Sequence, residues 1–247
     1  MDEQLYDAFL RLERTHWWFV ARQRILLDLT RRFVRPGGRI LDVGCGTGFY
    51  LEAVRGEFDA HGIDFSDTAV RMCHDRGLTS VTTETLEGLA AREPSTFDAV
   101  MFLDVVEHMD DDVGALKLAR RLLVPGGITM VTVPAYMFMW SSHDDMNQHR
   151  RRYVVSGLKS AMCLAGFNVE LATYFNTLLF PLALARRFSQ RVSRRDDYDE
   201  LALPPRLLNS FLRRVFELEA RLVPRAGRNG LLPFGLSVAG IGRVSER

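Results

Sequence analysis

The sequence predicts an α/β protein with a seven-stranded, mostly parallel sheet covered by helices on both faces. From residue 39 onward, short apolar runs alternate with segments of helical periodicity, and glycine-rich breaks separate them. This alternation is typical of parallel sheets, because each crossover helix packs back onto a face of the sheet. A length of 247 residues with 47% hydrophobic and 26% charged residues suits one globular domain carrying an insertion.

The first third of the chain predicts a helical arm and then three strands. Residues 1–34 place apolar side chains at helical spacing, and Pro36-Gly37-Gly38 ends the arm. Ser66 stands where it can cap a helix, and Gly77 stands where that helix would stop. The expected elements are strands 39–43, 60–64 and 78–82 and helices 49–55 and 66–76.

The remainder continues the alternation with four more strands. Asp110–Asp112 place acids at the start of a helix, where they complement its dipole. Pro125-Gly126-Gly127 is expected to turn the chain into the fifth strand. The expected elements are strands 97–103, 128–133, 167–173 and 236–243 and helices 110–123 and 156–165.

Roughly 60 residues separate strands six and seven, which is far longer than a hairpin loop. We therefore predict a helical cap at 1–36, a core formed by 37–175 and 234–247, and a helical lid at 176–233. Residues 186–228 hold 11 Arg against 6 acids. The apolar and basic segment 176–200 suits peripheral contact with an anionic membrane, a lipid-like or phosphate-bearing acceptor, or an ordinary solvated lid. The apolar face between 207 and 222 would also suit a homodimer.

Composition excludes several classes of protein. The net charge of +1 argues against a nucleic-acid partner, and three cysteines are too few for a disulfide framework. No apolar run approaches the roughly 20 residues of a spanning helix, and the acidic Met1–Gln4 lacks the pattern of a signal peptide. We expect a cytoplasmic protein that at most touches a membrane.

A glycine-rich motif carries the strongest functional signal. Leu41–Gly48 reads LDVGCGTG between a strand and a helix, so that the backbone can turn sharply and approach a ligand closely. Asp64 ends the next strand, where a carboxylate can accept both hydroxyls of a ribose. Asp42 would repel a pyrophosphate and attract an ammonium, and the G-x-G-x-G spacing differs from the dinucleotide pattern. An ordinary strand–helix turn is the alternative.

These motifs, with Phe97–Asp104 and the Leu122–Gly127 turn, resemble the class I S-adenosylmethionine-dependent methyltransferases. The resemblance covers about residues 37–175 and the final strand, and it implies a Rossmann-like fold. It also implies that an N-terminal helix covers the cofactor, although core packing is the alternative for at least one of Trp17 and Trp18. The cofactor-binding residues it implies are Asp42, Gly44, Cys45, Gly46, Gly48, Asp64, Phe65, Glu84, Leu86, Leu103, Asp104, Trp18 and Arg22. Thr82-Thr83 stand where the family often has an acid.

The segment Asp104-Val105-Val106-Glu107-His108 follows the fourth strand, beside the expected methyl group. His108 could act as a general base for a hydroxyl acceptor, and Glu107 could serve as a base as well. The segment also resembles the carboxylate-x-x-Glu-His cluster of the ubiquinone-pathway O-methyltransferases, which implies that Asp104, Glu107 and His108 hold a divalent metal such as magnesium. Helix-start chemistry and packing form the third interpretation.

A polar loop after the fifth strand supplies further candidates. Trp140–Asp145 and Gln148–Tyr153 lie on the rim where open α/β sheets bind ligands, and we expect His143 and His149 to be catalytic there. A plain polar loop, or a metal site made of His143, Asp144 and His149, is the alternative.

The resemblance implies methyl transfer from S-adenosylmethionine to a small or lipid-linked acceptor. O-methylation is preferred, because histidines lie where a hydroxyl proton must go. Carbon or nitrogen methylation is the runner-up, and a carbon acceptor would need Trp140, Tyr136 and Phe138 to shield a cation. A non-catalytic cofactor-binding protein and an NAD-dependent dehydrogenase are the competing classes.

Overall fold

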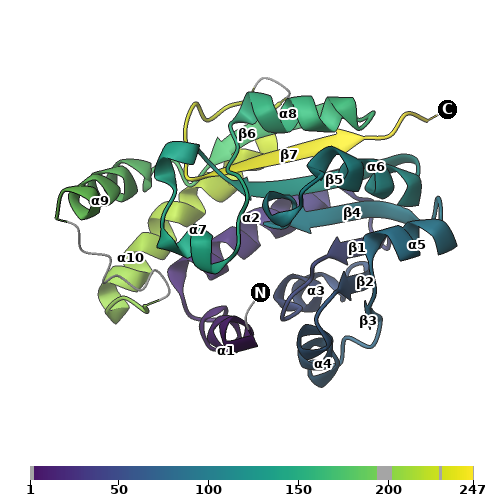
Figure 1. Ribbon diagram of the computed structural model, residues 1–247, viewed down its shortest axis with the longest axis horizontal. Helices are drawn as coiled ribbons and strands as arrows, with labels where there is room; N and C mark the ends of the chain where they lie inside the picture. Colours follow the sequence, from purple (N-terminus) through teal and green to yellow (C-terminus); the bar gives the residue numbers. More distant parts are fainter. Residues whose placement is uncertain (1–2, 194–201, 228–229, 247) are drawn as a thin grey trace.

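The computed structural model describes residues 3–193, 202–227 and 230–246, apart from the side chains of residues 3–5, 143 and 190–193. One seven-stranded sheet with the order β3-β2-β1-β4-β5-β7-β6 runs through the molecule (Figure 1). Only the pairs that β7 makes with β5 and β6 are antiparallel. The predicted fold class is confirmed. The strands are β1 (Arg39–Val43), β2 (Asp59–Asp64), β3 (Val81–Thr83), β4 (Phe97–Leu103), β5 (Leu123–Pro134), β6 (Asn168–Phe175) and β7 (Ser237–Arg243).

Helices cover both faces of the sheet, and each face has its own apolar cluster. One cluster joins the sheet to α2, α3, α4 and α10, whereas the other joins it to α5, α6 and α8. Strands buried on both faces explain the continuous apolar runs in the sequence. The helices are α1 (Glu3–Leu12), α2 (Trp17–Phe33), α3 (Phe49–Val54), α4 (Asp67–Asp75), α5 (Leu86–Arg92), α6 (Asp112–Leu122), α7 (Ser142–Met146), α8 (Val155–Leu164), α9 (Phe180–Ser193) and α10 (Arg206–Glu217).

Local signals placed most elements within one or two residues, with three exceptions. The expected third strand at 78–82 begins at Val81 instead, because the Leu78 N–H donates to Cys73 O and still belongs to the end of α4. Pro125–Gly127 lies within the span of β5 instead of before it. Helix α5 was not expected, although Thr85 caps it by accepting a hydrogen bond from the Gly88 N–H.

The segment between β6 and β7 divides between two places. Helix α10 packs against α2, and the ring of its fully buried Phe216 lies 6.0 Å from Trp17 and 6.3 Å from Phe175. Two short 3-10 turns, η3 (Leu218–Arg221) and η4 (Val223–Arg225), extend this layer. Helix α9 instead borders the large cavity discussed below. Within the described part of the chain, no helix has the length and apolar character needed to span a bilayer.

Candidate active site

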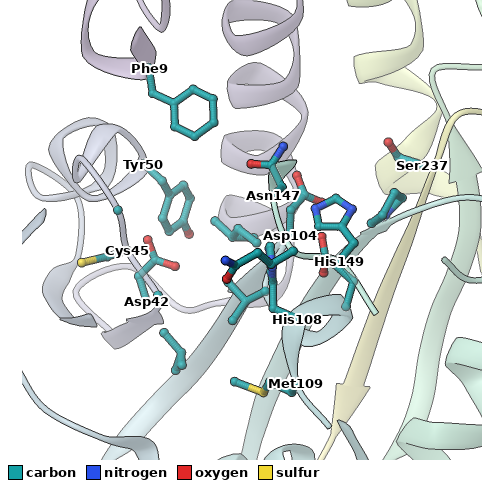
Figure 2. A pocket seen from close by; sticks show the side chains of 18 of the residues that line it. Phe9, Asp42, Cys45, Tyr50, Asp104, His108, Met109, Asn147, His149 and Ser237 are labelled. Atoms are coloured by element: carbon teal, nitrogen blue, oxygen red, sulfur yellow. The ribbon is translucent and has the colours of Figure 1, made fainter. Parts of the chain in front are cut away.

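A cavity of about 1250 Å³ opens at the carboxyl ends of β1, β2 and β4. Its walls come from α1, α2, the glycine-rich loop, the segments that follow β4 and β5, and α9. Figure 2 shows Asp42, Cys45 and Tyr50 on one side of the cavity and His108, Asn147 and His149 on another. The sheet order reverses between β1 and β4, and ligands of open α/β sheets bind at such a switch point.

The glycine-rich loop and Asp64 form one wall of the cavity. Gly44 and Gly46 have φ angles of +68° and +56°, a left-handed conformation that side chains disfavour, so the motif needs glycine there. The Gly46 N–H donates to Asp64 Oδ2 at 2.9 Å, and the Ser66 N–H donates to Asp64 Oδ1 at 2.9 Å. These two bonds fix a buried carboxylate at the cavity wall.

Asp42 and Asp104 face a shared cation, Arg22 of α2. Arg22 Nη2 lies 2.8 Å from Asp104 Oδ2 and donates to Thr132 Oγ1 at 3.0 Å, and its guanidinium stacks over Trp18. Asp42 Oδ1 is buried and has no hydrogen-bond partner among the described residues. Burial raises the pKa of Asp42 to about 8, although the charge of Arg22 opposes that shift. A cationic ligand would therefore restore the ionised form of Asp42.

Helix α1 closes over this part of the cavity. The Tyr6 hydroxyl donates to Asp64 Oδ1 at 3.5 Å, and Glu13 accepts a hydrogen bond from Thr47 Oγ1 at 2.6 Å. Glu13 also forms an ion pair with Arg76, and both side chains are almost fully buried. Sequence reasoning missed these contacts, because each one joins residues more than thirty positions apart. They tie the arm to the glycine-rich loop.

The far end of this wall carries the residues expected near an adenine. Leu86 is buried, whereas Phe65 is largely exposed over the cavity. Glu84 forms an ion pair with Arg92 at the same end. The space therefore combines an apolar surface with an acid, in place of the carboxylate that the third strand lacks.

An Asp–His pair lies on the opposite wall. Asp144 is fully buried, and its Oδ1 lies 2.8 Å from His149 Nδ1. Arg152 donates to both oxygens of Asp144, at 2.7 and 2.8 Å. These hydrogen bonds hold the pKa of Asp144 well below its usual value against the effect of burial. Because Asp144 is ionised, His149 Nδ1 is the donor and the lone pair lies on Nε2.

Glu107 and His108 lie next to that pair. The rings of His108 and His149 meet edge to face, with centroids 4.7 Å apart. Burial and the nearby His149 lower the pKa of His108 to about 4, so this ring is neutral at physiological pH. Glu107 is fully buried, neither of its carboxylate oxygens has a partner in the described structure, and burial raises its pKa well above the usual value.

The structure brings most of the expected site residues to the cavity. Gly48 is an exception, since it begins α3 and its missing side chain would collide with Leu78 and Cys73. The side chain of His143 lies outside the described ones. Tyr136, Phe138 and Trp140 are not among the residues found to line the cavity. Those that do line it are Trp18, Arg22, Asp42, Gly44, Cys45, Gly46, Asp64, Phe65, Glu84, Leu86, Leu103, Asp104, Glu107, His108 and His149.

Comparison with protein families gives one decisive match. A family model described as "Methyltransferase domain" matches residues 18–172, which is more than half of the chain. The chain belongs to this methyltransferase family. The resemblance drawn from the glycine motif, Asp64 and the strand-four segment is therefore confirmed.

Curated relatives of this methyltransferase share its core and differ outside it. A ubiquinone biosynthesis O-methyltransferase from Xanthomonas campestris is 35% identical over 136 residues, covering 49% of this chain and 56% of the relative. A protein of the same name from Ralstonia nicotianae is 37% identical over 97 residues, covering 37% of this chain and 41% of the relative. The chain thus spans about half the length of the curated relatives that it matches.

Solved structures show how far the methyltransferase fold extends along the chain. A putative methyltransferase from Haloferax volcanii, in complex with the activator Trm112, aligns with a TM-score of 0.64 at 18% identity, covering 99% of this chain and 96% of that one. A SAM-dependent methyltransferase from Archaeoglobus fulgidus aligns with a TM-score of 0.57 at 19% identity, covering 89% and 94%. At these identities the likeness shows the fold alone.

Proposed function

We propose that this methyltransferase transfers the methyl group of S-adenosylmethionine to a hydroxyl oxygen of its acceptor, with His149 as the general base. The pairing of His149 with buried Asp144 at the cavity wall carries the proposal. The name shared by the curated relatives supports an oxygen acceptor.

The cofactor would lie along the wall formed by the glycine-rich loop. Asp64, held by two backbone N–H groups, would accept hydrogen bonds from the ribose hydroxyls. Asp42 would bind the ammonium of the methionine part, and Arg22 its carboxylate. Glu84, Phe65 and Leu86 would border the adenine. Each role follows from the charge and position of the side chain.

The chemical step needs alignment and the removal of one proton. The acceptor oxygen attacks the methyl carbon while the bond from that carbon to sulfur breaks, and S-adenosylhomocysteine leaves. The acceptor proton passes to His149 Nε2, because Nδ1 already donates to Asp144. The imidazolium that forms is stabilised by the Asp144 carboxylate, which the bidentate contact with Arg152 keeps ionised. Positioning supplies the remaining rate enhancement.

A divalent metal would fit beside this base, with a donor set that differs from the expected one. Donor atoms of Glu107, His108 and His149 lie within 4.8 Å of one another, and the unpartnered oxygens of Glu107 suit a cation. Asp104 instead pairs with Arg22. Two imidazoles and one carboxylate suit manganese or zinc better than magnesium. Such an ion would lower the pKa of an acceptor hydroxyl.

The test uses a panel of hydroxylated aromatic acceptors led by catechol, with the methylated product located by mass spectrometry and NMR. We expect a methyl group on oxygen. His149→Ala should lower kcat about 10²–10⁴-fold, the usual contribution of a general base, and should leave S-adenosylhomocysteine affinity unchanged. His61→Ala is the matched control, because His61 pairs with Asp59 outside the cavity. Methylation at carbon, no methylated product from any acceptor in the panel, or full activity of His149→Ala would contradict the proposal.

Contact of segment 176–200 with an anionic membrane stays a prediction. Leu182 and Phe188 of α9 are exposed, as an interfacial helix requires, whereas residues 194–200 lie outside the described part of the chain. A homodimer through α10 also stays a prediction, based on the exposed Leu207 and Phe211.

A further inference from the structure

The two sides of the cavity carry opposite charge. Its described lining residues up to Leu118 include one arginine, Arg22, and many acids. From Pro134 onward the described lining residues include no acid, but they include Arg150, Arg152, Arg186 and Arg187. A cavity wall of one sign raises the local concentration of ligands of the opposite sign. The second side therefore favours an anionic group.

Two of these arginines already belong to the rim described above. Arg152 binds Asp144, and Arg150 Nη1 lies 2.8 Å from Asp110. Arg186 and Arg187 come from α9, where they share one helical face with Ala183, because residues three and four positions apart lie side by side. This face of α9 forms the outer wall of the cavity.

Asn176 lies at the base of that wall and has an unusual environment. It is fully buried and lines the cavity, yet neither its Oδ1 nor its Nδ2 has a hydrogen-bond partner among the described residues. A buried amide without partners costs roughly 1–3 kcal/mol, so such a group commonly serves a ligand. Its backbone has a φ of +58°, a strained conformation for a residue other than glycine.

Glu219 of the η3 turn holds Asn176 in this conformation. The Thr177 N–H donates to Glu219 Oε2 at 2.9 Å, and the Leu178 N–H donates to Glu219 Oε1 at 2.7 Å. The Leu236 N–H donates to Asn176 O at 3.4 Å, and Leu236 also lines the cavity. The inserted segment thus fixes a polar amide at the cavity, on the side that carries the arginines.

We propose that this side of the cavity binds a phosphoryl group of the acceptor, with Asn176 Nδ2 as a buried donor and Arg186 and Arg187 as the cationic wall. This inference rests on the proposed function, because it assumes that the acceptor enters opposite the cofactor. A carboxylate is satisfied by one bidentate arginine, whereas two guanidinium groups, an amide and the Ser237 hydroxyl provide enough donors for the oxygens of a phosphoryl group. The methylated hydroxyl would then lie toward His149.

The test is calorimetric titration of the full chain, saturated with S-adenosylhomocysteine, with inorganic pyrophosphate as the probe. We expect binding by the wild type and at least roughly tenfold weaker binding by Asn176→Gly. Glycine adopts the positive φ without strain, so this variant loses the amide and keeps the turn. Asn176→Asp should abolish binding by adding negative charge, and Arg187→Ala should weaken it.

Arg206→Ala is the matched control, since Arg206 is exposed on α10 and does not line the cavity. Pyrophosphate binding that is absent in the wild type, or equal in Asn176→Gly, overturns the proposal. Binding of benzoate without pyrophosphate also overturns it, because it assigns the side to a carboxylate. His149→Ala should bind pyrophosphate normally, so a failure of the proposed methyl transfer is distinguishable from a failure of this subsite.

Discussion

At the scale of single residues, burial decides the protonation state of the two acids closest to the expected methyl group. Asp42 and Glu107 are both more than nine-tenths buried, and each has an oxygen without a partner among the described residues. Water solvates an exposed carboxylate, but the interior of the cavity does not, so the neutral acid is favoured. Ligand binding can therefore change the charge of this site.

For Asp42 this shift predicts a proton released when the cofactor binds. With a pKa of about 8, Asp42 is mostly protonated at pH 7, and an incoming ammonium stabilises its ionised form. S-adenosylhomocysteine affinity should rise as pH increases from 6 to 8, by up to about tenfold per unit. Calorimetry in two buffers of different ionisation enthalpy measures the released proton. Asp42→Asn should release none, and equal release by both proteins would refute this assignment.

For Glu107 the raised pKa predicts a cost in stability at neutral pH. The folded state holds its proton while the unfolded state loses it near pH 4, so the free energy of unfolding falls as pH rises above that value. Glu107→Gln lacks this loss, and its melting temperature should exceed that of the wild type by more at pH 8 than at pH 5. A Gln variant that is less stable throughout this range would be the contrary result.

The same pair of proteins tests the metal site without any assay of activity. Manganese or zinc should raise the melting temperature of the wild type by binding the ionised Glu107, and should leave Glu107→Gln nearly unchanged. An equal shift in both would place the ion elsewhere.

At the scale of elements, α1 and α10 both depend on partners distant in the sequence. Helix α1 is tied to the glycine-rich loop through Glu13 and Thr47, and to Asp64 through Tyr6. Helix α10 places Phe216 between Trp17 and Phe175. The inserted segment is therefore part of the core layer under one face of the sheet as well as a neighbour of the cavity.

This packing predicts that part of the insert cannot be loosened without destabilising the protein. Phe216→Ala removes a fully buried ring and should lower the free energy of unfolding by about 3–5 kcal/mol. Leu207→Ala on the exposed face of the same helix should cost under about 0.5 kcal/mol. Urea denaturation of both variants measures the difference, and equal losses would argue against a structural role for α10.

At the scale of the whole molecule, the site is a meeting of segments that the sheet order brings together. The crevice beside β1 and β4 collects Asp42 and the glycine-rich loop from one side and Asp104 to His108 from the other. The loop after β5 and helix α9 complete the acceptor side, and α1 and α2 close over the cofactor side. A change of acceptor in related chains would therefore be expected in α9 and the loop after β5.

The sequence by itself determined the strand–helix order, the glycine-rich loop and the ribose acid. Their signals are local, since apolar periodicity, glycines with positive φ and caps such as Ser66 depend on neighbouring residues. Only the tertiary structure decided which charged groups meet. Asp144 and Arg152 around His149, Arg22 on Asp104, and unpartnered Asn176 follow from burial and from contacts across the fold. No local pattern encodes these partners, because the free energy of a buried charge depends on everything that surrounds it.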